Sequence, residues 1–351
     1  MKKIKFLIAA IIASTFTLSS CNSDDDGIEN NSENIYKDGV FVLSEGAMYS
    51  SNSEVAFYKN GLITQNIFNT SNNGKLLGSI GQSMIIEDDL AYIVLNASNK
   101  IEVVNANSFI SKATITSGLS NPRYLTSDDN YLYVSNWGDA SVPTDDFISV
   151  YKLSDLSYVK KIDVIEGPEK IIIENGKLII AHAGGWNNGN SVTIYNTKTD
   201  KSVQLKVGDV PSDIVEENNQ VYVLCSGITW GGNLSSGKLV TIDLATEKIT
   251  KSIDFKNGEN PKFLVEENNQ LYYTIYNKVY KVSMSATTLP QSPLFTTDTQ
   301  YTYGLNVKNN AIYISDAKDF ASNGEVKIYN QTGSIIGNFI TGVGPNTILF
   351  N

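Results

Sequence analysis

The sequence predicts an all-β fold, a seven-bladed β-propeller of four-stranded blades. The main observation is a short phrase that recurs seven times, each copy starting at an anchor residue 41 to 50 residues from the next. The anchors are Gly81, Pro122, Pro168, Pro211, Pro261, Thr302 and Pro345. A period of about 40 to 50 residues that holds several short strands is typical of a propeller.

The phrases share an apolar pattern, which is the second observation. An apolar residue lies three places after every anchor, at Met84, Leu125, Ile171, Ile214, Leu264, Leu305 and Ile348. Eleven places after the first six anchors lies the centre of a β-rich triplet, at Tyr92, Tyr133, Ile179, Tyr222, Tyr272 and Tyr313. The seventh phrase lacks this triplet, and its match is the segment 39–43 near the other end of the sequence. We therefore expect the C-terminal strand 346–350 to complete the N-terminal blade and close the ring.

The strands of one unit can be placed in order. In the unit that starts at residue 209, we expect strands at 212–216, 221–226, 238–244 and 249–255. The turn 217–219 contains two Asn residues, which tolerate the positive φ of tight hairpin turns. No stretch after residue 20 has a convincing helical period, so we expect an all-β domain.

The first 35 residues are interpreted as targeting segments. Residues 1–20 join a lysine-rich start to an apolar run at 6–13, as in a secretory signal peptide. Residues 18–21 resemble the lipobox of bacterial lipoproteins, which implies lipidation of Cys21. Residues 22–26, Asn-Ser-Asp-Asp-Asp, resemble the surface-export signal of Bacteroidota lipoproteins, with an ordinary acidic linker as the alternative. We expect a flexible tether over 21–35 and the propeller over 36–351.

Composition narrows the function classes. The net charge of −10 at pH 7 argues against nucleic acid as a partner, because phosphate contacts need clustered Lys and Arg. His182 is the only histidine, which excludes a multi-histidine metal centre and leaves a structural role or an axial ligand open. With Cys21 lipidated, Cys225 has no disulfide partner and is expected in the core. Asp145 and Asp146 could bind a cation but lack the spacing of a calcium loop. No motif of an enzyme is present, so no catalytic residue, metal or cofactor is predicted.

The aromatic residues of one loop set are the candidate site. Trp137, Trp186 and Trp230, the only tryptophans, fall 15, 18 and 19 residues after their anchors. We expect them in the loop between the second and third strands of three successive blades, on one mouth of the ring. The same loops elsewhere hold Tyr49, Tyr276 and Phe320. Packing of the indoles between blades is the alternative interpretation.

Polar residues accompany these aromatics. Asn136 and Asn187 lie beside two of the tryptophans, and the inner strands begin with Arg123, Lys170, Lys262 and Tyr303. Aromatic rings with converging amide and charged groups suit a large, polar, partly planar ligand. These residues are the predicted ligand-binding set.

The lipobox, the acidic segment behind it, the segment 39–46 and the recurring Pro-x-x-(Ile/Leu) phrases resemble the YncE-like, quinoprotein amine dehydrogenase-like propeller lipoproteins of Bacteroidota. The resemblance covers essentially the whole chain after residue 20. It implies a surface lipoprotein, held by its lipid anchor alone. As in the BtuG type, such a protein captures a corrinoid, or a siderophore or haem, and serves a TonB-dependent outer-membrane transporter. A protein-binding or adhesion propeller is the alternative function, and a lactonase-like or lyase-like enzyme a weaker third.

Overall fold

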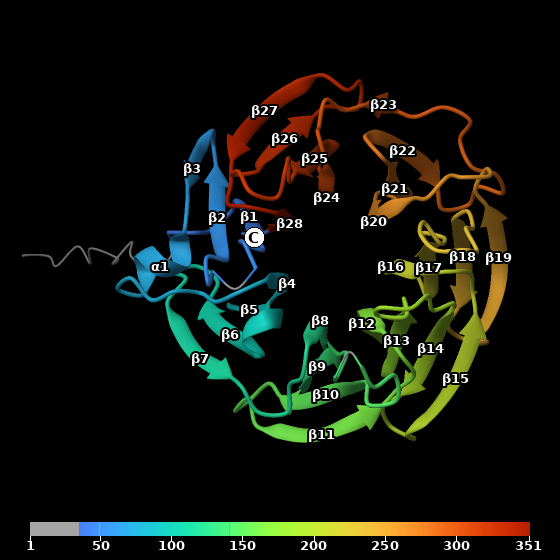
Figure 1. Cartoon of the computed structure of the whole chain (residues 1–351), viewed down its shortest axis with the longest axis horizontal. Helices are drawn as coiled ribbons and strands as arrows, with labels where there is room; N and C mark the ends of the chain where they lie inside the picture. The colour runs from blue at the N-terminus through green and yellow to red at the C-terminus, as the bar shows by residue number, and fades with distance from the viewer. Residues whose placement is uncertain (1–34, 49, 140) are drawn as a thin grey trace, which may run out of the picture.

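The computed structural model describes residues 35–48, 50–139 and 141–351 of the chain. These form seven four-stranded antiparallel sheets arranged as blades around a ring (Figure 1). The predicted fold class is therefore confirmed. We number the blades in chain order, with the blade that contains both ends of the described chain as blade 1.

The strands of each blade follow one another from the centre of the ring outwards. Blade 1 holds β28 (Pro345–Phe350), β1 (Val40–Ser44), β2 (Glu54–Lys59) and β3 (Leu62–Thr64), and blade 2 holds β4 (Gly81–Glu87), β5 (Leu90–Leu95), β6 (Lys100–Asn105) and β7 (Ser111–Ile115). Blade 3 holds β8 (Pro122–Ser127), β9 (Tyr131–Asn136), β10 (Phe147–Lys152) and β11 (Tyr158–Asp163), and blade 4 holds β12 (Pro168–Glu174), β13 (Lys177–His182), β14 (Ser191–Asn196) and β15 (Lys201–Lys206). Blade 5 holds β16 (Pro211–Glu217), β17 (Gln220–Cys225), β18 (Lys238–Asp243) and β19 (Lys248–Asp254). Blade 6 holds β20 (Lys262–Glu267), β21 (Gln270–Ile275), β22 (Lys278–Ser283) and β23 (Phe295–Thr296), and blade 7 holds β24 (Thr302–Lys308), β25 (Ala311–Asp316), β26 (Glu325–Tyr329) and β27 (Ile335–Ile340).

The ring is closed by strands from opposite ends of the chain. β28 pairs antiparallel with β1, with Ile348 opposite Val42 and Phe350 opposite Val40. Side-chain and backbone bonds of Asn351 reach Tyr36 and Gly39 and hold the junction. The expected completion of the N-terminal blade by the C-terminal strand is confirmed, and it gives blade 1 the same four strands as the other six blades.

The recurring phrase is explained by the packing between blades. The buried apolar residues form seven clusters, and each cluster joins two neighbouring blades. Every cluster contains one of the apolar residues found three places after an anchor, such as Met84 between blades 1 and 2. The triplet centres pack on the other side of each blade, as Tyr92 does against blade 3. The repeat therefore encodes the two faces of each sheet, since side chains of a strand alternate between faces.

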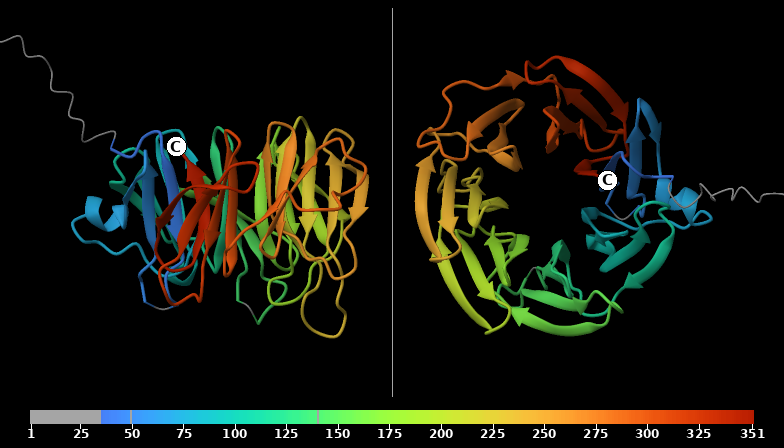
Figure 2. Two further views of the ribbon diagram at one scale, coloured as in Figure 1. Left: turned by 90° about the horizontal axis from the view of Figure 1, so that it is seen from above. Right: turned by 180° about the vertical axis from the view of Figure 1, so that it is seen from behind.

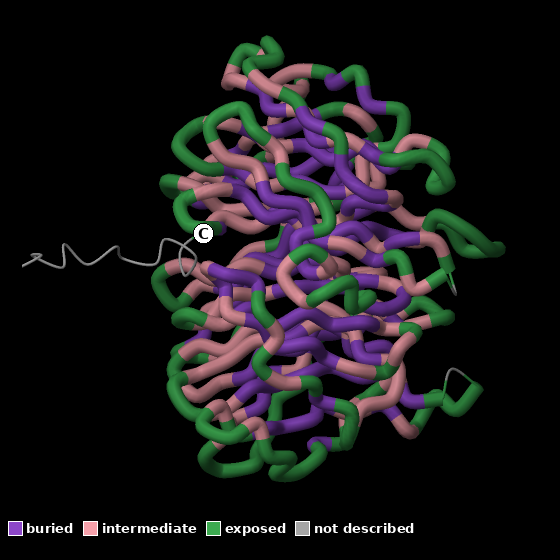
Figure 3. The backbone as a smooth tube through the Cα atoms, turned by 90° about the vertical axis from the view of Figure 1, so that its left-hand side faces the viewer, coloured by how far each residue is buried: buried purple, intermediate pink, exposed green. Residues whose placement is uncertain are grey.

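The disc has two distinct faces. The longer loops between second and third strands project from one face, which we call the loop face, while the C-terminus lies on the other (Figure 2). Tyr36 is fixed on that opposite face by its backbone bond to Asn107 and by packing on Phe57 and Phe109. Buried residues concentrate in the strands inside the blades, and exposed residues lie in the loops at both faces and on the outer strands (Figure 3). In the part of the chain that is described, no helix is long and apolar enough to cross a membrane.

Two short helical segments accompany the sheets of this all-β domain. α1 (Ile67–Ser71) lies between blades 1 and 2, and the 3-10 turn η2 (Asn96–Ser98) joins β5 to β6. Ile67 and Phe68 are fully buried in the core cluster between these blades. A helix of five residues is too short to show a 3.6-residue period, so the pattern gave no sign of it.

Candidate functional site

Loop lengths shape the loop face. The loop between second and third strands has twelve residues in blade 5 (226–237) and eight in blade 7 (317–324). In blade 6, between them, the same connection is the two-residue turn Tyr276–Asn277. The longer loops of blades 5 and 7 extend past the short turn of blade 6 and leave a notch between them.

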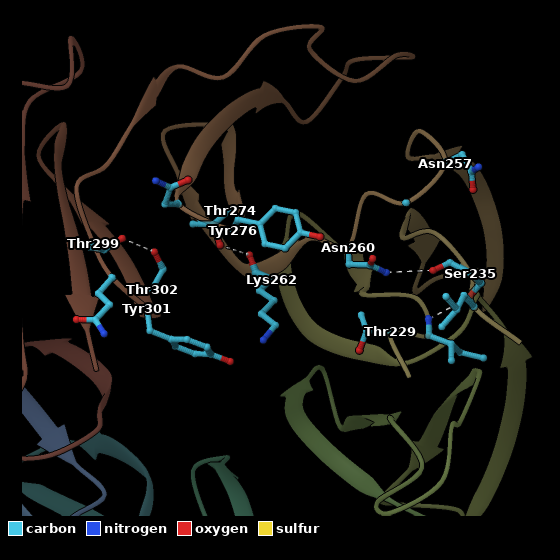
Figure 4. Close-up of a pocket in the computed structure, with 15 residues that line it drawn as sticks. Thr229, Ser235, Asn257, Asn260, Lys262, Thr274, Tyr276, Thr299, Tyr301 and Thr302 are labelled. Atoms are coloured by element: carbon cyan, nitrogen blue, oxygen red, sulfur yellow. Dashed lines mark hydrogen bonds between the residues drawn. The ribbon is translucent and has the colours of Figure 1, made fainter. Parts of the chain in front are cut away.

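A cavity of about 790 Å³ occupies this notch. It is lined by Ile228, Thr229, Leu234, Ser235, Asn257, Gly258, Asn260, Lys262, Thr274, Tyr276, Asn277, Thr299, Gln300, Tyr301 and Thr302 (Figure 4). The volume falls within the usual range for small-molecule sites. The lining offers two tyrosine rings, several amides and hydroxyls, and one lysine.

The walls of the cavity are held by hydrogen bonds. On the blade 5 side, Asn260 Nδ2 donates to the carbonyl oxygens of Ser226 (2.7 Å) and Ser235 (3.0 Å), which fixes the twelve-residue loop to the start of β20. On the blade 7 side, the carboxylate of Asp316 accepts the backbone N–H groups of Gln300 and Tyr301, both at 2.8 Å. These bonds fix the walls of the cavity on both sides.

Four of the predicted residues gather at or beside this cavity. Lys262 and Tyr276 line it directly. Phe320 and Tyr303 lie next to it and pack edge to face, with ring centroids 4.8 Å apart. Phe320 also packs at 4.9 Å on Tyr301, a cavity residue that the sequence analysis missed. Trp230 lies in the loop that forms the blade 5 wall and is 60% exposed.

A second group forms between blades 3 and 4. Trp137 and Trp186 meet edge to face with centroids 6.4 Å apart, and the Arg123 guanidinium lies over the Trp137 ring at 3.9 Å. Trp186 is 68% exposed, whereas Trp137 is half-buried and donates from Nε1 to the carbonyl oxygen of Pro168 (3.1 Å). Trp137 is therefore partly packed between blades 3 and 4, while Trp186 and Trp230 are open to solvent.

The Arg123 guanidinium is hydrogen-bonded to side chains of the neighbouring blades. Its Nε and Nη2 donate to the two carboxylate oxygens of Glu169 at 2.9 and 2.7 Å, and its Nη1 donates to Gln82 at 2.6 Å. Burial alone would lower the pKa of Arg123, but the Glu169 carboxylate and its hydrogen bonds raise it. Such a bidentate pair links blades 2, 3 and 4 and leaves little of the guanidinium for a ligand.

The other predicted residues are placed as follows. Lys170 is 3.4 Å from the Asp213 carboxylate and 5.1 Å from the Tyr124 ring centroid. Asn187 lies at the surface and donates to Glu166 at 2.6 Å. Asn136 is fully buried, because its side chain bonds to Ser120, Val134 and Ser149 inside blade 3, so it does not face the mouth. Tyr49 lies outside the described residues.

Tyr303 belongs to a separate buried network. Its hydroxyl donates to Glu45 Oε1 at 2.8 Å, and Asn346 Nδ2 donates to the same oxygen at 3.1 Å. Burial raises the pKa of Glu45 against the lowering effect of these two bonds. This contact ties blade 7 to the closing blade.

The remaining chemical candidates are structural. His182 is fully buried between the Ile165 carbonyl oxygen (3.1 Å from Nδ1) and the Thr193 hydroxyl (2.9 Å from Nε2), and burial lowers its pKa to about 4. Cys225 is buried, which raises its thiol pKa to about 12. Asp146 accepts the Gly167 N–H, and burial raises its pKa to about 6. Across the described segments, no group of three or more His, Cys, Asp and Glu residues is arranged to hold a metal ion.

Comparison with known proteins identifies the family. A family described as "Domain of unknown function (DUF5074)" matches residues 38–338, which is most of the chain. The chain belongs to the DUF5074 family. A comparison with curated proteins found no match to this DUF5074 protein.

Solved structures share the fold of the DUF5074 domain. A quinoprotein alcohol dehydrogenase-like protein from Bacteroides thetaiotaomicron has a TM-score of 0.67 at 17% identity, over 90% of this chain and 79% of its own. BamB from Moraxella catarrhalis has a TM-score of 0.51 at 16% identity, over 87% and 83%. The dihydro-heme d1 dehydrogenase NirN has a TM-score of 0.56 at 11% identity, over 91% and 76%. At these identities the likeness shows a common propeller architecture.

Proposed function

We propose that this DUF5074 protein is a non-enzymatic, surface-exposed lipoprotein that captures a large, polar, partly planar small molecule on its loop face. A corrinoid is the first ligand to test, and a siderophore or haem are the others. In this proposal the captured molecule passes to a TonB-dependent outer-membrane transporter, as the resemblance to BtuG-type proteins implies. Cys21, the proposed lipidation site, lies outside the described residues.

The observation that carries the proposal is the cavity at blade 6. Tyr276 and Tyr301, 76% and 42% exposed, present aromatic surface at its edge. Exposed aromatic rings lose a large apolar area from water when a flat ligand covers them. The lining contains no Asp, Glu, His or Cys, which are the side chains that most often act as acid, base or nucleophile. This chemistry favours binding over catalysis.

The position of the first described residues suits the proposed anchoring. Tyr36 is fixed on the face opposite the loop face. A membrane anchor joined through the preceding residues would therefore attach on the far side from the cavity. The loop face would be left free for a ligand and for a transporter.

Equilibrium titration of the purified protein with cobalamin, cobinamide, haem and ferric siderophores tests the capture role. The informative variants are Trp186→Ala with Trp230→Ala, and Tyr276→Ala, because all three side chains are mostly exposed. The matched control is Tyr158→Ala, an aromatic residue that is 43% exposed on the outer strand β11. We expect loss of binding in the loop-face variants and none in the control. Absence of binding by every compound would refute the capture role.

The location is tested on intact cells. An externally added protease should release the protein if it is exposed on the surface. Protection until the cells are lysed would place it in the periplasm and contradict the surface proposal. A Cys21→Ser variant, which removes the acylated thiol, should lose membrane attachment.

Exposed apolar loop tips favour a second candidate, a protein-binding or adhesion role. Met48, Trp186, Trp230 and Leu234 are 60% to 68% exposed on the loops between second and third strands. Aromatic residues and Met are enriched at protein interfaces. If the titrations fail, pull-down from envelope fractions with wild type and with Trp186→Ala/Trp230→Ala would test this role.

A further inference from the structure

One position on the inner strands sets blade 6 apart. The residue directly after each anchor lies at the mouth of the central channel, at Gln82, Arg123, Glu169, Ser212, Lys262, Tyr303 and Asn346. Six of these side chains hydrogen-bond to other residues, including the Arg123–Glu169 pair and the Tyr303–Glu45–Asn346 group. Within the described chain, the Lys262 ammonium has no hydrogen bond and no carboxylate within 4 Å. Among these seven positions, Lys262 is therefore the charged residue that has no counter-ion.

Lys262 also carries the only charge of the cavity. All other lining residues are neutral, although the whole chain has a net charge of −10 at pH 7. Acidic residues around a binding site would repel an anion, and this lining has none. The lining of the cavity therefore presents a single positive charge in a protein that is acidic as a whole.

The surroundings of Lys262 are suited to a ring that carries an anionic group. Figure 4 shows its side chain reaching into the space between Tyr276 and Tyr301. The Lys262 Nζ lies 5.8 Å from the centroid of the Tyr301 ring, within the range of a cation–π contact that leaves its charge available to a ligand. Gln300, Thr229 and Asn257 add neutral donors and acceptors along the same lining.

We propose that the blade 6 cavity selects ligands with a carboxylate or phosphate group, which pairs with Lys262 while an adjoining ring lies against Tyr276 or Tyr301. The inference rests on the proposed capture role, since it places the ligand in this cavity. It goes further because it specifies the charge of the ligand and the residue that binds the charged group. Lys262 is exposed to solvent in the cavity, and a charge-assisted hydrogen bond to its ammonium is about twice as strong as a neutral one, which allows it to discriminate between ligands.

The test uses probes that differ only in the anionic group. 4-Nitrophenyl β-D-glucuronide and 4-nitrophenyl β-D-glucoside have the same rings, but the first has a carboxylate where the second has a hydroxymethyl group. 4-Nitrophenyl phosphate tests whether a phosphate group can take the place of the carboxylate. Ligand-observed NMR titrations would be run with wild type, Lys262→Gln and Lys262→Arg. The matched control is Lys256→Gln, which removes the same charge from an exposed residue near the cavity but outside its lining.

We expect at least one anionic probe to bind wild type about tenfold or more tightly than the glucoside. Lys262→Gln should abolish that preference, while Lys262→Arg and Lys256→Gln should keep it. Equal binding of charged and neutral probes, an unchanged preference in Lys262→Gln, or no binding of either anionic probe would each overturn the inference. These outcomes are separate from the capture role itself, because cobalamin or haem could still bind through the aromatic rings when the charge preference is absent.

Discussion

Tyr276 provides a sharp test of whether the cavity is built for a ligand. It occupies the first position of the two-residue turn of blade 6 with φ of 54°, and it is 76% exposed. A bulky residue in the left-handed region is strained by about 1 kcal/mol or more. Neither the turn nor the core needs a tyrosine here, so the strain is consistent with a role in binding.

The perturbation is Tyr276→Asn, since Asn adopts a positive φ readily. About a quarter of the Tyr276 side chain is buried, or roughly 50 Å², so its loss costs about 1 kcal/mol of unfolding free energy. Relief of the strain returns about the same amount. The expected change in stability is therefore within about 1 kcal/mol of zero. Tyr273→Ala, three residues earlier on β21 and 1% exposed, should instead cost about 3 to 5 kcal/mol.

Ligand affinity, unlike stability, should fall strongly in Tyr276→Asn. A stacked ligand that covers about 100 Å² of the ring gains roughly 2.5 kcal/mol from burial and about 1 kcal/mol from stacking. Tyr276→Asn should thus weaken binding by about 3 kcal/mol, or about a hundredfold. The assays are denaturant unfolding and titration with the tightest binder among cobalamin, cobinamide, haem and ferric siderophores. A stability loss above about 2 kcal/mol, or an unchanged affinity, would refute the reasoning.

Three further predictions concern the framework. Deletion of residues 345–351 removes β28 and opens blade 1, so we expect an aggregating protein by size-exclusion chromatography, whereas a circular permutant that keeps β28 beside β1 should stay monomeric. His182 has a folded pKa of about 4, below its usual 6.5, so its contribution to stability is complete above pH 6.5 and is lost as the pH falls from 6.5 through 4. The wild type should lose about 3 kcal/mol of unfolding free energy relative to His182→Gln over that range, and parallel pH profiles would contradict this. Arg123→Met leaves the Glu169 carboxylate without its partner and should cost about 3 kcal/mol of unfolding free energy at pH 7. The double variant Arg123→Met/Glu169→Leu should recover part of this loss. Equal stability of the single and double variants would contradict a stabilising role of the Arg123–Glu169 pair.

Much of the fold could be predicted from the sequence because each blade must bury both faces of its sheet. That requirement repeats the same apolar positions, and the expected strands 212–216 and 238–244 agree with β16 and β18 to within two residues. The tight turn at Asn218 and Asn219 has the positive φ values that its composition indicated. Closure of the ring by β28 was also predicted, because the seventh repeat is divided between the two ends of the sequence and their pairing completes its blade.

The candidate site could be predicted only in part because loops carry no repeat. The spacing placed Tyr276 and Lys262 on the loop face, and both line the cavity. It could not show that Asn136 turns inward, because that depends on hydrogen bonds to Val134 and Ser149 in three dimensions. Asn260 and Tyr301 were missed, although each directly precedes an anchor and such residues lie at the mouth.

Departures from the repeat locate the site better than the repeat itself. In five blades the residue before the anchor has a positive φ, at Ile80, Asn121, Gly167, Val210 and Gly344. The two exceptions are Asn260 and Tyr301, and both line the cavity. The shortest loop between second and third strands and the ring position without a counter-ion belong to the same blade 6. A structural repeat constrains every blade equally, so deviations from blades 6 and 7 that meet at one notch indicate a demand other than folding, and the proposed ligand site is consistent with that demand.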